Sequence, residues 1–484
     1  MAPNVTVCIP AYRSEAFIHN TLRSLLTQTY SDFVVEIAVE PPAEEILSAC
    51  GPLLRDDRVR ITVNPQVLGW AENIKSLLRR VATPYFLILY HDDLLLPDYI
   101  TTLLDELIRR PQASVAYSDM VCFGAASFHW PLRLTEEPIF DRLMSFFLGG
   151  TEAVPVRGVT RSSVREHCDF PTDRYDGFAA ECEWVLHLLI SGTALHVPRP
   201  LYLKRMFGPN EITAARKRLL GYSREYLFEA LEHHRARMLA LIRQTDLPKP
   251  MRDTVELAAE AAMLRRHMTF GMGAFHQVQL ARAEQIMTTA GAMPGSYGKG
   301  IQAMSLLAMS QHALIEGDTK TALDLAIAAV DADPHQWEGL AHLSRLQLDT
   351  NRSIEAFDTA LRAWAVEPDA GGLRELIADC EPSIEYQIDA QIVAFGPNTV
   401  ELGQPFNVQP SGASAIWVCA SRNLSRGSRI RLGESILNTS IQGAIATAEV
   451  PRSIIQHAGN LSVSLVGPDG KPRSNIASLE VTQR

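Results

Sequence analysis

Short apolar runs alternate with helix-like stretches along the first 215 residues of the chain. Runs typical of buried strands lie at 5–10, 34–39, 59–63, 85–90 and 115–117. Between them, apolar residues recur at helical spacing at 15–28, 70–81 and 99–109. This alternation predicts βαβ units and a mostly parallel sheet. Ligands of such sheets bind beyond the carboxyl ends of the strands.

The next stretch, 216–380, has helical periodicity and no convincing strand. Within it Ala322, Ala326, Ile327, Ala329 and Pro334 recur 34 residues later as Ala356, Ala360, Leu361, Ala363 and Pro368. Small alanines allow paired helices to approach closely, and a proline ends the second helix. This repeat, clearest over 317–368, resembles the tetratricopeptide repeat.

From residue 382 onward, short alternating runs are separated by Gly, Pro and Asn turn signals, which predicts a β-sandwich. The segment 459–481 resembles the last hairpin of an IPT/TIG-type immunoglobulin-like domain. We therefore expect three domains: an α/β domain at 1–215, an all-α domain at 216–380 and an all-β domain at 382–484.

Composition narrows the function classes. The 484 residues include 45 Lys and Arg against 55 Asp and Glu, a net charge of −10 that disfavours a nucleic-acid partner. The seven cysteines form no CxxC motif, so we expect reduced core thiols of a cytoplasmic protein. We predict no signal peptide and no transmembrane segment. Peripheral association with the inner face of a membrane stays open.

An acidic pair, Asp92 and Asp93, follows the fourth strand. Adjacent carboxylates repel each other unless something offsets their charge, and oxygen ligands suit Mg²⁺ or Mn²⁺. His91 is a possible further ligand. The alternative is structural: Asp93 caps the following helix and Asp92 is simply solvated.

Three blocks of the sequence together resemble family 2 glycosyltransferases with the GT-A fold. The first begins VTVCIPAYRSEAF at Val5 and includes Gln28-Thr29-Tyr30. The second begins VNPQVLGWAEN at Val63 and ends in the acidic pair. The third, DGFAAECEWVLHLL, begins at Asp176 and leads into Pro200-Leu201-Tyr202. The resemblance spans most of residues 4–206.

This resemblance implies an inverting glycosyltransferase that uses a nucleotide-diphosphate sugar and a divalent cation. It implies Glu181 as the general base, with Glu183 as the fallback, and Asp93 and Asp92 as metal ligands. The structural alternatives are a helix-dipole acid for Glu181 and a solvated residue for Glu183. The nucleotide-sugar-binding candidates are Pro10, Tyr12, Glu40, Asn73, Asp92 and Arg205.

Acceptor contacts are assigned to Arg157, Trp130 and Trp184. Arg157 could instead form a structural ion pair. The aromatic cluster around Trp130 could instead form the apolar core of a loop. The acceptor is a hydroxyl of a glycan, as in bacterial-type surface polysaccharide, of a lipid-linked glycan or of a protein. The helical repeats and the β-sandwich would bind a protein partner or mediate self-association.

The sequence departs from the family pattern at four places. Glu40 is followed by two prolines instead of a second acid, Tyr90 replaces the first acid of the metal motif, and the base is Glu. The histidine that often follows Pro-Leu-Tyr and an arginine is not evident in Arg205-Met206-Phe207-Gly208. These departures motivate a second hypothesis, a catalytically degenerate scaffold that binds proteins. A nucleotidyltransferase is disfavoured because no Gly-rich phosphate-binding loop follows the first strand.

Overall fold

The computed structural model describes most of the 484 residues. The described residues are 4–130, 132, 134, 138–149, 151–166, 169–172, 175, 177–208, 222–269, 277–368, 370, 372–387, 391–421, 424, 427–467 and 470–483. The chain forms two compact units, one of residues 1–342 and 366–371, the other of 343–365 and 372–484.

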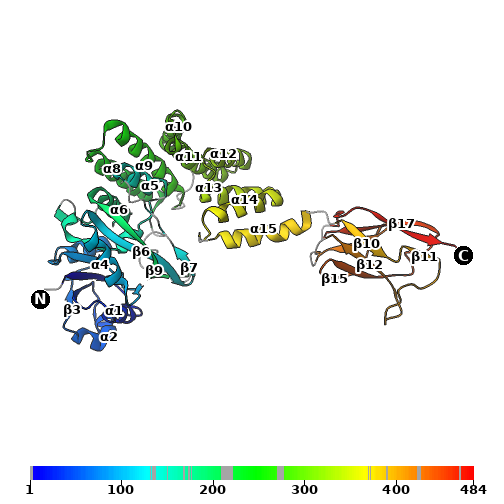
Figure 1. Ribbon diagram of the computed structural model, residues 1–484, viewed down its shortest axis with the longest axis horizontal. Helices are drawn as coiled ribbons and strands as arrows, with labels where there is room; N and C mark the ends of the chain where they lie inside the picture. The colour runs from blue at the N-terminus through cyan, green and yellow to red at the C-terminus, as the bar shows by residue number, and fades with distance from the viewer. Residues whose placement is uncertain are drawn as a thin grey trace. The chain divides into compact units, whose positions relative to one another are not determined.

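A nine-stranded mixed sheet organises the first unit (Figure 1). Its strands are β1 (Val5–Ala11), β2 (Phe33–Val39), β3 (Val59–Val63), β4 (Tyr85–Ile88), β5 (Leu94–Leu95), β6 (Ala113–Gly124), β7 (Phe128–Trp130), β8 (Val159–Arg161) and β9 (Thr193–Met206). They are ordered β3-β2-β1-β4-β8-β6-β9-β5, with β7 paired to β6. The four strands β3-β2-β1-β4 are parallel, as the alternating pattern predicted.

The rest of the sheet is mixed. β8 runs antiparallel to both β4 and β6, whereas β9 runs parallel to β6. Every residue of β1 and β2 is buried, which explains their continuous apolar runs. The helices of this part are α1 (Ile18–Leu26), α2 (Glu44–Cys50), α3 (Trp70–Leu78), α4 (Tyr99–Arg109), α5 (Ile139–Leu148) and α6 (Ala180–Ser191). The α/β fold class is confirmed.

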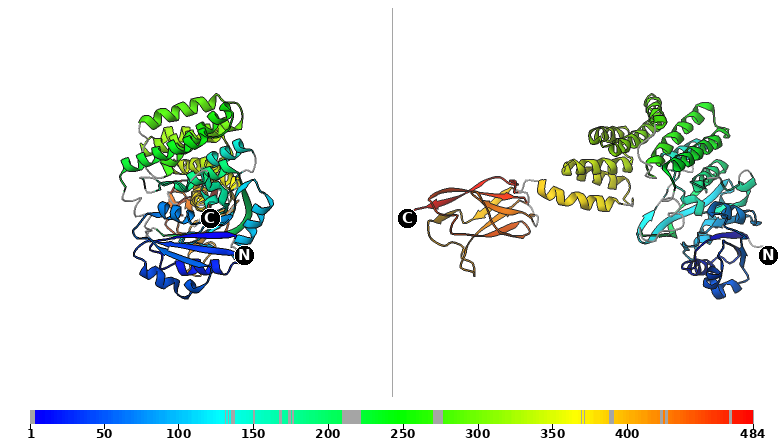
Figure 2. Two further views of the ribbon diagram at one scale, coloured as in Figure 1. Left: turned by 90° about the vertical axis from the view of Figure 1, so that its left-hand side faces the viewer. Right: turned by 180° about the vertical axis from the view of Figure 1, so that it is seen from behind.

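The following region is helical, as expected. Its helices are α8 (Arg224–Arg243), α9 (Lys249–Thr269), α10 (Gln277–Gly291), α11 (Ser296–Ile315), α12 (Thr319–Ala332), α13 (Trp337–Asp349), α14 (Ser353–Val366) and α15 (Leu373–Gln387). α8 packs on α6, and α9 packs on α5 (Figure 2). One apolar core runs without a break from Val5 in the sheet to Ala308 in α11.

The same hydrogen bond between neighbouring helices occurs in both copies of the 34-residue repeat. Ser310 Oγ on α11 donates a hydrogen bond to the carbonyl oxygen of Ala322 on α12, at 2.6 Å. Ser344 Oγ on α13 makes the same bond to Ala356 on α14, at 2.7 Å. Both serines are fully buried. The same helix-to-helix link therefore occurs at both copies of the repeat.

The end of the chain is an all-β region with its own apolar core. One sheet contains β10 (Ile392–Gly396), β12 (Ser414–Ala420), β16 (Ile445–Val450) and β15 (Thr439–Gln442), in that order. The other contains β11 (Thr399–Glu401), β18 (Ala477–Thr482), β17 (Gly459–Val466), β13 (Arg429–Leu432) and β14 (Ser435–Ile436). This confirms the expected all-β fold class of the last part.

The predicted domain boundary at 215/216 lies outside the described residues. The boundaries at 215 and 380 stay predictions. Among the helices of the described ranges, none has the length and apolar composition needed to cross a membrane.

Candidate active site

Side chains from four distant segments meet beyond the end of β4. Tyr90 and Asp93 follow β4, and Arg157 ends the short 3₁₀ helix Val154–Arg157. Glu181 lies in the first turn of α6, and Tyr202 lies on β9. The parallel strands deliver the acidic motif to the edge of the sheet where ligands of α/β folds bind.

Asp93 is enclosed by protein donors. Tyr202 donates its hydroxyl to Asp93 Oδ2 at 2.7 Å, and the Arg205 backbone N–H donates to Oδ1 at 2.8 Å. Only 2% of the Asp93 side chain is exposed. Burial, and then the charge of the neighbouring Asp92, raises the pKa of Asp93 above its ordinary value. Both Asp93 oxygens are therefore already engaged within the protein.

Arg157 connects the two candidate carboxylates. Its Nε lies 3.7 Å from Asp93 Oδ2, and its Nη2 lies 3.6 Å from Glu181 Oε1. The guanidinium also lies over the ring of Tyr90, 4.6 Å from the ring centroid. Its side chain is 10% exposed. The structure therefore places Arg157 in the structural ion pair considered as the alternative, rather than on an open acceptor surface.

Glu181 is accessible and oriented. The Tyr90 hydroxyl donates a hydrogen bond to Glu181 Oε1, and 29% of the Glu181 side chain is exposed. Tyr90 stands at the position where the family motif has its first acid, and sequence reasoning treated it only as a loss. Tyr202 was also missed as a site residue, although it lies in the Pro-Leu-Tyr strand that carried part of the resemblance.

The loop before α6 needs left-handed backbone. Gly177 has φ +71°, and Ala179, which immediately precedes the helix, has φ 58°. A Cβ on Gly177 would lie 2.4 Å from the Cβ of Ala71 on α3. Glycine is thus required there both by the backbone conformation and by the close approach of α3.

Glu183, the fallback base, faces the opposite way. Its Oε1 lies 2.9 Å from His234 Nδ1 and its Oε2 lies 2.7 Å from Arg237 Nε, both on α8. Only 2% of the side chain is exposed, so Glu183 is not the solvated residue of the structural alternative.

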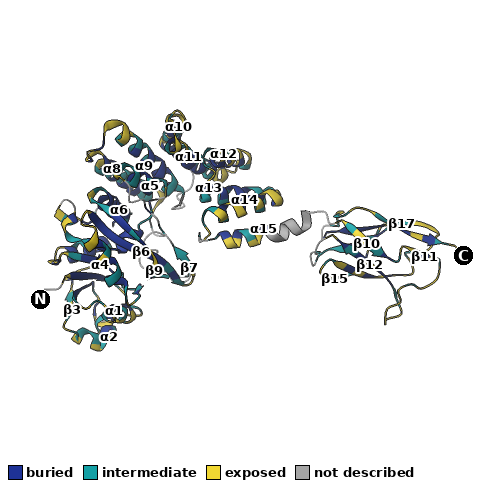
Figure 3. Ribbon diagram, in the orientation of Figure 1, coloured by how far each residue is buried: buried dark blue, intermediate teal, exposed yellow. Residues whose placement is uncertain are grey.

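Trp184 is a correction to the predicted acceptor contacts. It has no exposed surface and packs against Phe86 and Phe170. Most of α6 is buried (Figure 3), and Trp184 belongs to the apolar core of this unit. Trp130 ends β7 half-buried, with its ring 5.9 Å from that of Phe128.

Asp92 and Arg205 differ from Asp93 in being accessible. Arg205 Nε donates to the backbone oxygen of Asp92 at 3.1 Å, and its guanidinium lies between the rings of Phe17 and Phe123. Within the described part of the chain, no hydrogen bond or ion pair involves the Asp92 carboxylate. His91 Nδ1 lies 2.9 Å from the backbone oxygen of Pro10.

Asp92 and Asp93 differ as candidate ligands of a divalent cation. Among the described residues, no three His, Cys, Asp or Glu side chains are grouped to hold a metal ion. Mg²⁺ and Mn²⁺ sites of nucleotide enzymes need only one or two carboxylates, because substrate phosphates complete them. The accessible Asp92 carboxylate fits that requirement directly. The Asp93 side chain is only 2% exposed, and each of its oxygens already accepts one hydrogen bond, which leaves it less open to a cation.

The remaining nucleotide candidates border the same edge of the sheet. Glu40 is 2% exposed and accepts from the Leu68 backbone N–H at 3.0 Å. Asn73 is buried, accepts from Asn64 Nδ2 at 3.0 Å and donates to the Ala38 carbonyl oxygen at 3.1 Å. Both side chains hold the backbone around the ends of the strands. Tyr12 is half-buried, with the Arg13 guanidinium 5.3 Å from its ring centroid.

Comparison with solved structures returned proteins of low sequence identity. Residues 1–349 of Staphylococcus aureus TarS in complex with UDP-GlcNAc are 15% identical, with a TM-score of 0.47, over 68% of this chain and 91% of that one. S. aureus TarS is 12% identical, with a TM-score of 0.43, over 99% and 78% of the two chains. The Pyrobaculum calidifontis mannosyltransferase PcManGT, in complex with GDP-Man and Mn²⁺, is 16% identical, with a TM-score of 0.38, over 69% and 87%.

Comparison with protein families is more direct. Residues 6–160 match the family described as Glycosyl transferase family 2. The match runs from β1 into β8 and includes the acidic pair, Tyr90 and Arg157. The N-terminal α/β part of this chain is accordingly a glycosyltransferase domain.

Proposed function

We propose that this protein transfers a sugar from a nucleotide-diphosphate sugar to a hydroxyl acceptor, with inversion at the anomeric carbon. The observation that carries the proposal is the Tyr90–Glu181–Arg157 group beside the acidic pair. It presents one accessible carboxylate, Glu181, and one buried carboxylate, Asp93, that share a single arginine.

In the proposed reaction Glu181 accepts the proton of the acceptor hydroxyl as that oxygen attacks the anomeric carbon. The new glycosidic C–O bond forms while the bond from the sugar to the diphosphate breaks, and the electron pair leaves with the nucleoside diphosphate. Tyr90 and Arg157 hold the Glu181 carboxylate in one orientation, which lowers the entropic cost of reaching the reactive geometry.

The leaving diphosphate needs positive charge. Arg205 supplies it from a side chain fixed between Phe17 and Phe123. Asp92 would hold a divalent cation, with His91 as a further candidate ligand, and such a cation neutralises the charge that develops on the diphosphate. We propose that Glu40, Asn73, Pro10 and Tyr12 shape the nucleotide side of the site.

The acceptor is proposed to be a glycan, a lipid-linked glycan or a protein. The repeated helices and the all-β region would recruit it, or would join copies of the chain. We also propose the division into domains 1–215, 216–380 and 382–484, with the residues that contact the substrates in the first, and a cytoplasmic location with or without peripheral membrane contact.

A degenerate scaffold is the second candidate. The observation that favours it is the burial of Asp93, whose oxygens accept hydrogen bonds from Tyr202 and Arg205 and which is therefore less accessible to a cation than the expected pair requires. In this case the α/β domain would bind nucleotide or protein without turnover.

Donor turnover separates the two candidates. The purified chain would be incubated with UDP-, GDP- and dTDP-sugars, with Mn²⁺, with Mg²⁺ or with a chelator, and released nucleoside diphosphate would be measured. We expect release with one donor class and its loss in the chelator. No release and no donor binding across the panel would contradict the enzyme and favour the scaffold.

A further inference from the structure

Two acidic residues at the start of α6 contact different parts of the protein. Glu181 points toward the sheet, where it contacts Tyr90 and Arg157. Glu183 points toward α8. Successive residues of an α-helix are rotated by about 100°, so residues two apart lie on nearly opposite sides. Whatever holds Glu183 therefore also fixes the rotation of α6 about its axis and the position of Glu181.

Glu183 is held from two directions. His234 Nδ1 lies 2.9 Å from Oε1, and Arg237 Nε lies 2.7 Å from Oε2. The His234 side chain is 1% exposed and that of Glu183 is 2% exposed. A buried carboxylate that loses a partner retains its desolvation cost, so this contact resists small shifts of α6.

A second contact reaches the residue between them. Arg266 Nη1 on α9 lies 3.1 Å from Cys182 Sγ and donates to Thr151 Oγ1 at 2.6 Å. Cys182 is 5% exposed. Two helices from beyond the predicted 215/216 boundary thus contact consecutive residues at the start of α6, and the apolar core is continuous across the same boundary.

We infer that α8 and α9 belong to the catalytic unit and that His234 and Arg237 are positioning residues, which act on the reaction by holding Glu183 and hence Glu181. The inference rests on the proposed role of Glu181 as general base. It adds a requirement to that role: residues 1–215 do not contain all the contacts that orient the base.

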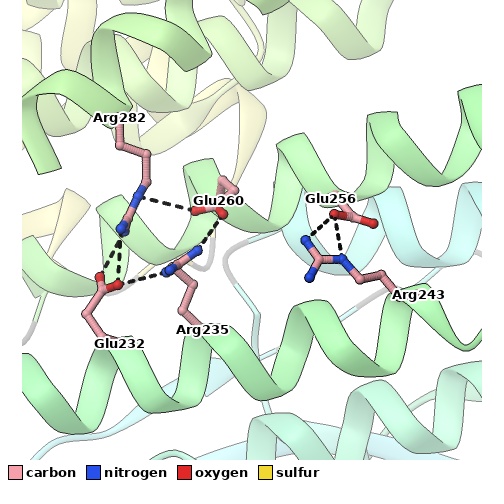
Figure 4. A network of polar contacts seen from close by, with 6 residues as sticks. All are labelled: Glu232, Arg235, Arg243, Glu256, Glu260 and Arg282. Atoms are coloured by element: carbon pink, nitrogen blue, oxygen red, sulfur yellow. Dashed lines mark hydrogen bonds and ion pairs between the residues drawn. The ribbon is translucent and has the colours of Figure 1, made fainter. Parts of the chain in front are cut away.

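The test uses the full chain and four variants. His234→Leu removes the ring donor, whereas His234→Asn retains an N–H near the position of Nδ1. Arg237→Met removes the second partner at a half-exposed position, with 32% of the side chain exposed. Arg243→Ala is the matched control, because Arg243 lies on the same helix and pairs with Glu256 rather than with α6 (Figure 4).

The readouts separate positioning from folding. They are kcat and donor KM with the fastest donor of the panel, the Kd of its nucleoside diphosphate by calorimetry, and the thermal midpoint. A small displacement of a catalytic group costs up to about a hundredfold, so we expect His234→Leu and Arg237→Met to lower kcat by about tenfold to hundredfold. We expect the nucleoside diphosphate Kd to stay within about twofold, and His234→Asn and Arg243→Ala to keep most of kcat.

A cycle with Glu181→Gln distinguishes this inference from the proposed function. If His234 acts through Glu181, His234→Leu has no further effect on kcat in the Glu181→Gln background. Equal loss in both backgrounds, unchanged kcat in folded His234→Leu and Arg237→Met, or parallel loss of nucleoside diphosphate binding would each overturn the positioning role. An unchanged kcat in Glu181→Gln alone would instead overturn the role of Glu181. If His234→Leu does not fold, Arg237→Met decides the same question.

Discussion

The Tyr90 hydroxyl donates a hydrogen bond to the Glu181 carboxylate, joining residues that are 91 positions apart in the sequence. Tyr90 lies just beyond β4, and Glu181 lies in the first turn of α6. The position at which the sequence lacks an expected acid is therefore occupied by a donor that orients the candidate base. We propose that Tyr90, at the position of the missing acid, orients Glu181.

Removing this donor tests its function. A hydrogen bond to a charged group contributes about 1.5–3 kcal/mol, so we expect Tyr90→Phe to lower kcat by about tenfold or more. Glu181→Gln should lower it by about a hundredfold or more, as for loss of a general base. Tyr85→Phe is the control, because the Tyr85 hydroxyl lies 3.3 Å from Arg161 Nη1, away from Glu181. Release of nucleoside diphosphate measures all three, and equal rates for Tyr90→Phe and Tyr85→Phe would exclude the orienting function.

Substitutions in the acidic pair should have different effects: loss of Asp92 should change the metal dependence of turnover, and loss of Asp93 should lower the stability of the fold. Asp92→Ala is expected to raise the Mn²⁺ concentration needed for half-maximal turnover, with little change in thermal midpoint, because its carboxylate is accessible. Asp93→Ala is expected to lower the free energy of unfolding by about 2–3 kcal/mol, because Tyr202 and Arg157 lose a buried partner. Metal titration of turnover and thermal unfolding of both variants measure these effects. If Asp93→Ala changes the metal dependence and Asp92→Ala the stability, Asp93 is the metal ligand instead.

Gly177 should be less replaceable than Gly51, another glycine with positive φ but with open surroundings. Gly177→Ala combines positive φ with a 2.4 Å approach to Ala71 Cβ, whereas Gly51→Ala has φ +53° and no neighbour within 4 Å. We expect about 1–3 kcal/mol of destabilisation for Gly51→Ala from its backbone conformation alone, and about 1–3 kcal/mol more for Gly177→Ala because its Cβ would also crowd α3. Denaturant unfolding measures both, and kcat should fall only for Gly177→Ala. Equal destabilisation by the two substitutions would show that α3 moves to accommodate the added Cβ at residue 177.

The helices α8, α9 and α10 are joined by a closed ring of charges that should make stability depend on pH (Figure 4). Glu232 and Glu260 alternate with Arg235 and Arg282 around this ring. Burial alone would raise the pKa of Glu232, but the bonds and charges of Arg282 and Arg235 hold that pKa below its ordinary value. A lowered folded pKa means that this stabilisation is present above the unfolded pKa and is lost as pH falls through the folded pKa.

The corresponding variant is Glu232→Gln. At pH 7 we expect it to lower the free energy of unfolding by about 1 kcal/mol, because the ring is only partly exposed. As the pH falls below about 4, the difference from the unsubstituted chain should shrink. Glu256→Gln is the control, since its partner Arg243 is 61% exposed, and little change is expected. A difference that persists undiminished in acid would show that packing, rather than charge, is responsible.

The sequence alone was sufficient to predict the features that depend on local residue patterns, namely the parallel strands, the paired helices and the family resemblance. Alternation of apolar runs and helical spacing predicted the parallel strands β1 to β4, because a buried strand and an amphipathic helix differ in period. The 34-residue repeat predicted the paired helices that Ser310 and Ser344 now link. Ordered blocks of residues led to the glycosyltransferase family, and the match over residues 6–160, which includes the first two blocks apart from Val5, bears that out for them.

The tertiary structure decided which of two neighbouring acidic side chains is accessible and which is enclosed by other parts of the protein. Asp92 and Asp93 are adjacent and chemically identical in the sequence, yet only Asp93 is enclosed, because β9 brings Tyr202 and Arg205 beside it. Glu181 and Glu183 are equivalent acids of one helical turn, and α8, some fifty residues onward, engages only Glu183. Long-range packing, which no local spacing encodes, thus separates the accessible carboxylates from the structural ones.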